Sequence, residues 1–146
     1  MSASNTCETA LLNLVFANSN FANVGDATGL RGSSTAGSVY VSLHSADPTE
    51  SGNQTSSELA YTSYARVAVA RSGSGWTVSG NSASNAAAIN FPACTGSSGT
   101  AVFFGIGTDS SGSGTLLFSG ALTSSLAISS GITPSFAIGA LTVTAD

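Results

Sequence analysis

Charged side chains are scarce in this sequence of 146 residues. Only 7% of its residues are charged, and lysine is absent; soluble domains average roughly 25%. The cationic residues are Arg31, Arg66 and Arg71, and the formal net charge is −4. Binding to nucleic acid draws most of its affinity from cations that neutralise phosphates. The charge balance therefore excludes a nucleic-acid partner.

Long apolar runs, cysteine and histidine are also rare. No segment reaches the roughly 18 consecutive apolar residues that span a bilayer, and residues 1–5 lack the basic residue of a secretion signal. We therefore expect synthesis in a cytoplasm and no membrane partner. In that reducing compartment Cys7 and Cys94 are interpreted as small buried apolar groups, not as a disulfide. Two cysteines and the single histidine, His44, cannot supply the usual zinc ligands.

The sequence is rich in small and hydroxyl-bearing residues. Its hydrophobic fraction of 42% and mean hydropathy of +0.29 are enough for a buried core. A surface solvated by hydroxyls and amides repels neighbouring molecules weakly, because charge usually keeps proteins apart. The pattern favours a protein that sits against other copies of itself. The alternative is a domain whose surface is merely neutral.

The N-terminal segment carries a helix signal. Asn5 and Glu8 have the spacing of a capping box. Apolar residues then recur at helical spacing on one face, namely Leu11, Leu14 and Val15. A helix is predicted over residues 6–17, followed by an irregular loop or arm over 18–37 that is rich in Asn, Gly, Ser and Thr.

From residue 38 the pattern alternates as in β-strands. Val39, Val41 and Leu43 point to one face, and Tyr40, Ser42 and His44 to the other. Further short strands are predicted at 61–71, 76–79, 86–91, 101–106, 115–119, 122–128 and 140–144. Short strands with Gly-rich turns predict a mostly β fold, a jelly-roll-like β-sandwich with one short N-terminal α-helix and an extended loop or arm.

Two parts are predicted along the chain. Residues 1–37 are interpreted as an assembly element made of the helix and arm, and residues 38–146 as the β-sandwich domain. A helix of about 12 residues is marginal alone in water, so its apolar face must dock either on its own domain or on a neighbouring subunit. On the second alternative, removal of residues 1–37 leaves a folded β domain that no longer assembles normally.

Catalytic patterns are absent from the sequence. His44 and Asp47 are three residues apart, which places them on opposite faces of an extended strand, and no G-x-S-x-G motif accompanies them. His44 is therefore predicted to be a surface or interface histidine. Residues 105–107 lack the third glycine and the lysine of a nucleotide loop. Asp47, Glu50 and Glu58 share a loop region without the ligand series of a calcium loop, so we predict no enzyme, catalytic residue, metal or cofactor.

The aromatic residues and Arg66 suggest contacts with partners. Tyrosine and tryptophan anchor protein interfaces, and they also stack on sugar rings when they share a face. Arg66, in a chain with few cations, is predicted either to pair with a carboxylate, Glu58 or Asp47, or to reach a partner. The predicted interface residues are Leu11, Leu14, Val15, Tyr40, Tyr64, Arg66 and Trp76.

Several stretches resemble, in order, a family of small proteins of tailed phages and prophages that are labelled tail-fibre-like or virion structural. The most distinctive is Tyr64-Ala65-Arg66-Val67. The others are Val39-Tyr40-Val41-Ser42-Leu43-His44-Ser45-Ala46-Asp47-Pro48, Gly75-Trp76-Thr77-Val78, Ala86-Ala87-Ala88-Ile89-Asn90-Phe91-Pro92, Phe104-Gly105-Ile106-Gly107-Thr108, Leu117-Phe118-Ser119-Gly120-Ala121-Leu122 and Gly131-Ile132-Thr133-Pro134.

The resemblance implies a structural component of a virion. Its location would be that of a capsid decoration protein or of a tail- or fibre-associated protein, acting through protein–protein contacts with major capsid or tail proteins. A homo-oligomer is expected, and a trimer if the protein sits on the threefold axes of a capsid. The alternative is a module on the particle that binds a host receptor or glycan.

Overall fold

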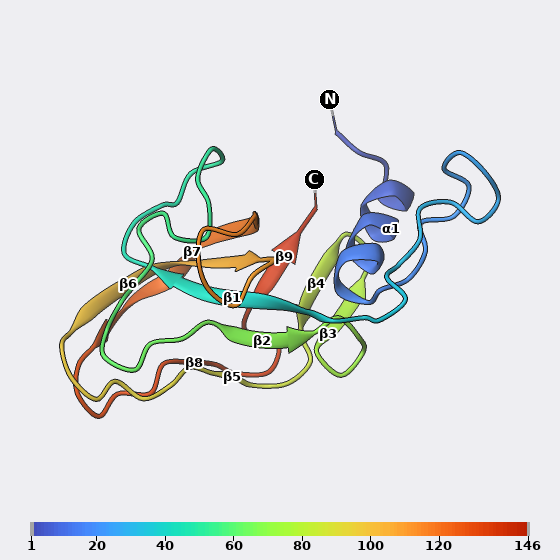
Figure 1. Ribbon diagram of the computed structural model, residues 1–146. Helices are drawn as coiled ribbons and strands as arrows, with labels where there is room; N and C mark the ends of the chain where they lie inside the picture. The colour runs from blue at the N-terminus through green and yellow to red at the C-terminus, as the bar shows by residue number, and fades with distance from the viewer. Residues whose placement is uncertain (1, 146) are drawn as a thin grey trace. The chain divides into compact units, whose positions relative to one another are not determined.

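The computed structural model describes residues 2–145, which form one helix and antiparallel β-structure (Figure 1). The elements are α1 (Asn5–Phe16), β1 (Ser38–His44), β2 (Val67–Ala70), β3 (Trp76–Ser79), β4 (Ser82–Asn85), β5 (Ile89–Asn90), β6 (Gly99–Gly107), β7 (Leu116–Ile128), β8 (Ser135–Phe136) and β9 (Thr142–Thr144). The predicted mostly β fold with an N-terminal helix is confirmed, and the sheets are consistent with a β-sandwich. Among the described residues, no helix is long and apolar enough to cross a membrane.

The chain forms two compact units. The first unit comprises Met1–Ser38, Val69–Ile89 and Phe136–Asp146, and the second comprises Val39–Ala68 and Asn90–Ser135. The predicted division at residue 38 does not follow these units, because two later segments cluster with the helix.

In the first unit, α1 packs against β3 and β4 of the three-stranded sheet β3-β4-β9 (Figure 1). The buried face of the helix consists of Glu8, Leu12 and Phe16, which follow one another at a spacing of four residues. The ring of Phe16 lies 4.5 Å from the ring of Trp76 between centroids. The helix is thus part of the core of this unit, which argues against the expectation that removal of residues 1–37 leaves the rest folded.

One predicted detail of the helix is corrected, and the exposure of its predicted interface residues is defined. Leu11 is 41% exposed, and Leu14 and Val15 are half-buried, so the face that packs into this unit is the one that carries Leu12 and Phe16. The N-cap is Ser4 and not Asn5, since the Ser4 hydroxyl accepts a hydrogen bond from the amide of Cys7 at 3.3 Å.

The second unit is built on β1, β6 and β7, which follow β2 in the four-stranded sheet β2-β1-β6-β7. β1 pairs antiparallel with β6, and β6 with β7. The predicted apolar face of β1 is confirmed, because Val39, Val41 and Leu43 are buried.

Strand boundaries differ from the prediction in several places, and β8 was not predicted. The strands expected at 115–119 and 122–128 form the single 13-residue strand β7, whose register shifts opposite Ala101–Phe103. Residues 61–66 are irregular, because Ser63 has a φ of 78° and the amide of Tyr64 bonds the carbonyl of Tyr61. β4 was not predicted, since its sequence Ser-Ala-Ser-Asn has no apolar alternation.

Candidate functional site

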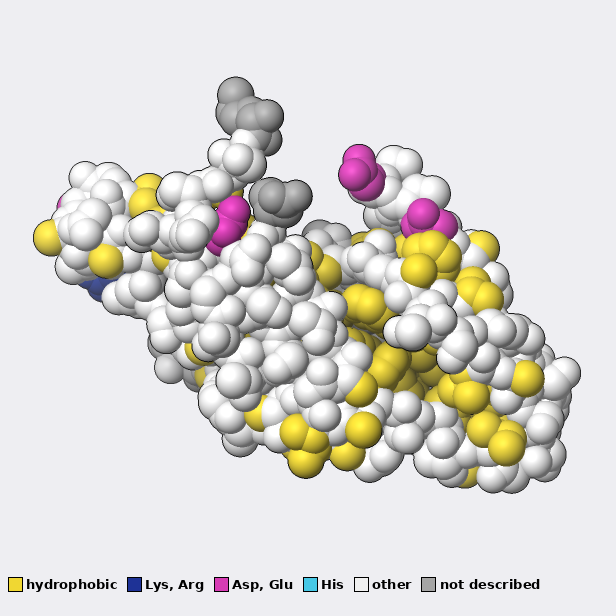
Figure 2. All heavy atoms as spheres, turned by 180° about the vertical axis from the view of Figure 1, so that it is seen from behind, with side chains coloured by type: hydrophobic (Ala, Val, Ile, Leu, Met, Phe, Trp, Pro, Cys, Tyr) yellow, Lys and Arg dark blue, Asp and Glu magenta, His cyan; other side chains and the backbone are white. Residues whose placement is uncertain are grey.

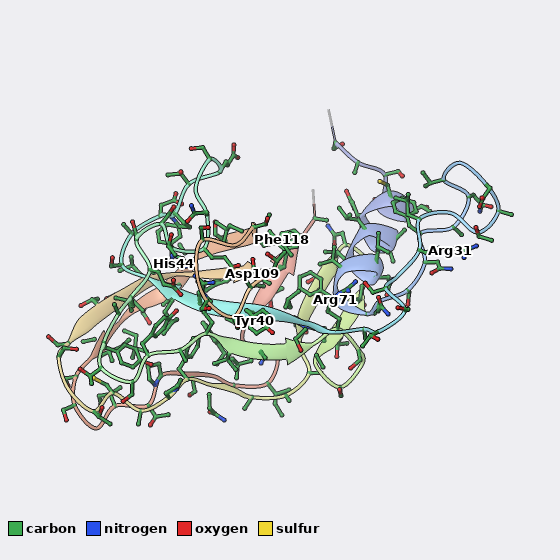
Figure 3. The ribbon with its side chains drawn as sticks, viewed as in Figure 1. Arg31, Tyr40, His44, Arg71, Asp109 and Phe118 are labelled. Carbon is green, nitrogen blue, oxygen red and sulfur yellow. The ribbon has the colours of Figure 1, made fainter. Side chains whose placement is uncertain are left out.

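The seven predicted interface residues are divided between the two units. Leu11, Leu14, Val15 and Trp76 belong to the first unit, and Tyr40, Tyr64 and Arg66 to the second. Trp76 is 1% exposed and packs on Phe16, so it offers no free surface to a partner. Tyr40 is half-buried on β1 (Figure 3). Tyr64 and Arg66 are held in a polar cluster inside the second unit.

Arg66 makes a two-point ion pair with Glu58. Its Nε donates to Glu58 Oε1 and its Nη2 to Oε2, each at 2.7 Å. The Arg66 side chain is 3% exposed, so the pair is shielded from solvent. The hydrogen bonds to Glu58 raise the pKa of Arg66 above its ordinary value. Of the two carboxylates expected from the sequence, Glu58 is the partner.

The remaining donors of Arg66 bind the loop between β6 and β7. Nη1 donates to the carbonyl of Asp109 at 2.9 Å, and Nη2 to the carbonyl of Gly112 at 2.7 Å. The buried side chain of Gln54 binds the same loop through two hydrogen bonds. Its Nε2 donates to the Asp109 carbonyl at 3.2 Å, and its Oε1 accepts from the Asp109 amide at 2.9 Å. Asp109 is labelled in Figure 3. Arg66 and Gln54 therefore fix this loop at two points.

Tyr64 connects the ion pair to β1. Its hydroxyl donates to Glu58 Oε1 at 2.9 Å and accepts from the amide of Leu43 at 3.1 Å. Burial, together with the neighbouring Glu58, raises the pKa of Tyr64 above its ordinary range. The Tyr64 hydroxyl therefore stays protonated and links Glu58 to the backbone of β1 through hydrogen bonds.

His44 is fully buried on β1 (Figure 3), which corrects the prediction of a surface or interface histidine. Its Nδ1 lies 2.8 Å from the carbonyl of Ser56, and its Nε2 lies 2.8 Å from the hydroxyl of Ser42. Because a carbonyl only accepts, Nδ1 carries the proton and Nε2 accepts from Ser42. Both ring nitrogens are thus occupied by structural bonds.

The two glycines of the Gly105-Ile106-Gly107 stretch make room for this cluster. Gly105 lies opposite Ser42 in the register, and a Cβ on it would come within 2.6 Å of His44 Nε2. A Cβ on Gly107 would collide with the side chain of Gln54. Glycine at these two positions therefore leaves space for the buried side chains of His44 and Gln54.

Burial lowers the pKa of His44 below its ordinary value near 6.5, and the nearby charge of Arg66 lowers this pKa further. The hydrogen bond to the Ser56 carbonyl and the charge of Glu58 raise the pKa, but they offset only part of the decrease. As the pH falls below 6.5, the His44 ring therefore becomes protonated more readily in the unfolded chain than in the folded second unit. Stability is complete above pH 6.5 and falls as the pH drops from there toward the folded-state pKa, with a slope of up to about 1.4 kcal/mol per pH unit.

Denaturation followed through tyrosine near-ultraviolet circular dichroism measures this slope, because all three tyrosines lie in the second unit. His44→Gln is the matched variant without a titrating ring. Equal slopes for both proteins between pH 6.5 and 5 would contradict a neutral, buried His44.

In the first unit, Arg71 ties the arm to the end of the helix (Figure 3). Its Nη2 donates to the carbonyl of Leu14 at 2.7 Å and its Nε to that of Val15 at 2.6 Å. Its Nη1 donates to the Ala36 carbonyl at 3.0 Å. A cation at the C-terminus of a helix also meets the negative end of the helix dipole. Arg71 was not predicted, because three of its four acceptors are backbone carbonyls, which side-chain patterns do not reveal; the fourth is the hydroxyl of Ser33, at 3.2 Å.

β7 lies at an edge of the four-stranded sheet. It has no charged residue and no proline along its 13 residues. Leu117 is 37% exposed. Residues 116–119 and the loop residues Thr49 and Glu50 line a cavity of about 280 Å³ beside the strand. The free edge can accept another strand, because its outer backbone groups have no partner within the sheet.

The polar cluster holds loops together, and the edge of β7 offers a surface for association. Among the described residues, no group of three or more His, Cys, Asp or Glu side chains could hold a metal ion.

Comparison with known proteins agrees with this description. A family model described as "Podophage GP4 fiber I protein gp80" matches residues 2–144. No curated protein matches the sequence. Since the match extends over nearly the whole sequence, the chain belongs to this family of phage fibre proteins.

Proposed function

We propose that the protein is a non-enzymatic component of a phage fibre that acts through protein–protein contacts, and that the edge of β7 is one of the contact surfaces. The carrying observation is the length and neutrality of this edge. Native proteins protect free edges with lysine, proline, short strands or bulges. The pairing of β7 with β6 has two register shifts, at Ala101–Phe103 and at Ile106–Gly107, and between them residues 118–121 form a regular, uncharged edge.

The rest of the surface supports the same role. Figure 2 shows a face on which charged side chains are few and uncharged groups cover most of the area. Weak charge repulsion lets copies of the chain approach one another closely. A homo-oligomer that also contacts other virion proteins fits such a surface, and the fibre family favours a tail- or fibre-associated position over capsid decoration.

The non-enzymatic part of the proposal rests on the groups that usually perform catalysis. Both ring nitrogens of His44 make hydrogen bonds within the unit. Arg66 donates its hydrogen bonds to Glu58 and to the loop carbonyls of Asp109 and Gly112. These bonds join segments of one unit. Such groups stabilise loops and do not offer a nucleophile or a base to a substrate.

Leu117→Lys tests the role of β7. A lysine on an edge strand opposes pairing with a second strand, so we expect self-association to weaken by at least about tenfold, or about 1.4 kcal/mol. Sedimentation velocity of the full chain over a range of concentrations measures the effect. Ile132→Lys is the matched control, since Ile132 is also an exposed apolar residue of the second unit, at 39%. A monomeric parent protein, or equal effects of both variants, would remove β7 from the interface.

A further inference from the structure

A groove in the first unit lies between α1 and the segment that follows it. Its volume is about 720 Å³, which falls within the range of small-molecule sites. Its walls are the helix residues Asn5, Thr6, Thr9, Ala10 and Asn13, on a face beside the one that packs into the core, and loop residues 19–23.

The lining is uncharged and unusually rich in asparagine. The chain has nine asparagines, and four of them are among the ten lining residues: Asn5, Asn13, Asn20 and Asn23. The local concentration is therefore not explained by overall composition. Thr6, Thr9 and Ser19 add hydroxyl groups. No charged side chain lines the groove, so nothing in it would neutralise an ionic ligand.

Much of this hydrogen-bonding capacity is unused. Within residues 2–145 the side-chain amides of Asn5 and Asn23 make no hydrogen bond. Asn20 uses its oxygen to accept from the amide of Gly32 at 3.1 Å, and Asn13 donates to the Thr9 carbonyl at 3.0 Å. Each amide still offers a donor, an acceptor or both. An amide can both donate and accept hydrogen bonds, and so can a hydroxyl group, so the two can pair in either direction.

An apolar surface completes the groove. The half-buried ring of Phe21 lies among the lining residues. Its backbone is fixed by two hydrogen bonds with Leu30, at 2.8 and 2.9 Å. The Asn18 amide holds the base of this loop through Ser33, at 2.7 and 2.9 Å. The Phe21 ring, with amide side chains on either side, can pack against the apolar face of a sugar. Because the loop is already fixed by hydrogen bonds, binding would cost less conformational entropy.

From this lining we infer that the groove binds a neutral glycan. Free amides meet the hydroxyls of the sugar, the Phe21 ring meets its C–H face, and the absence of charge disfavours acidic sugars. This inference goes beyond the fibre role, and it does not depend on the edge of β7.

An array of neutral and acidic oligosaccharides, probed with the labelled full-length protein, tests the inference. We expect binding to neutral members that is absent from sialylated or uronate-containing ones. The double variant Asn5→Ala/Asn23→Ala should weaken binding by at least about tenfold, because it removes two unoccupied amides from the wall. Asn90→Ala is the matched control, since Asn90 is exposed and lies outside the groove.

A second readout follows the side-chain amides directly. The NMR signals of the Asn5 and Asn23 amide groups should shift when the bound neutral oligosaccharide is titrated into the parent protein. Three results would overturn the inference: no binding to any neutral member, a preference for acidic members, or binding that the double variant retains. Self-association is measured separately, so failure here leaves the result for Leu117→Lys unaffected.

Discussion

Replacement of Arg66 by alanine is expected to lower the free energy of unfolding of the second unit by about 3–5 kcal/mol, since it leaves the Glu58 carboxylate buried without its partner. The same change releases the carbonyls of Asp109 and Gly112, which Arg66 binds at 2.9 and 2.7 Å. Denaturant titration followed through tyrosine near-ultraviolet circular dichroism measures the loss in the unit that holds all three tyrosines.

Two further variants make this test specific. Arg31→Ala removes an exposed arginine whose side chain makes one long bond, at 3.5 Å, to Thr28, so its effect should stay within about 0.5 kcal/mol. Arg66→Lys keeps the charge but not the two-point geometry, and should recover only part of the loss. An Arg66→Ala protein as stable as Arg31→Ala would show that the ion pair contributes nothing net.

Phe16→Ala should destabilise the first unit by about 3–5 kcal/mol, the usual cost of truncating a fully buried aromatic side chain. Phe16 has no exposed surface, and its ring lies 4.5 Å from that of Trp76. Trp76 is the only tryptophan, so its fluorescence reports this unit during unfolding. Leu11→Ala is the matched control on the same helix, because Leu11 is 41% exposed.

The outcome also decides what the helix does. If α1 belongs to the core, a chain that lacks residues 1–37 should show red-shifted Trp76 fluorescence. A truncated chain whose tryptophan stays in an apolar environment would instead support the interpretation of residues 1–37 as a separable assembly element. Equal stability of Phe16→Ala and Leu11→Ala would point the same way.

The sequence predicted elements well where apolar residues follow a clear period. β1 alternates Val39, Val41 and Leu43, and that face is buried as expected. The other face of the same strand was assigned to solvent, because Ser42 and His44 are polar. Buried polar side chains with complete hydrogen bonds give the same pattern as exposed ones, so alternation alone could not reveal the cluster.

The candidate sites depend on contacts between distant segments. The Arg66–Glu58 pair was among the predicted pairs, since few carboxylates were available to this arginine. Gln54 and its partner Asp109 are 55 residues apart, and no local pattern connects them. The groove beside α1 likewise depends on how loop 19–23 folds back along the helix, which propensities do not specify.

Location on the particle tests the central claim most directly. Purified phage particles would be labelled with gold-conjugated antibody against this chain and examined by electron microscopy, and its copy number would be measured by quantitative mass spectrometry of the same preparation. A fibre component predicts label along the fibres and a fixed number of copies per particle. Absence of the chain from purified particles, or label confined to the capsid, would contradict the account.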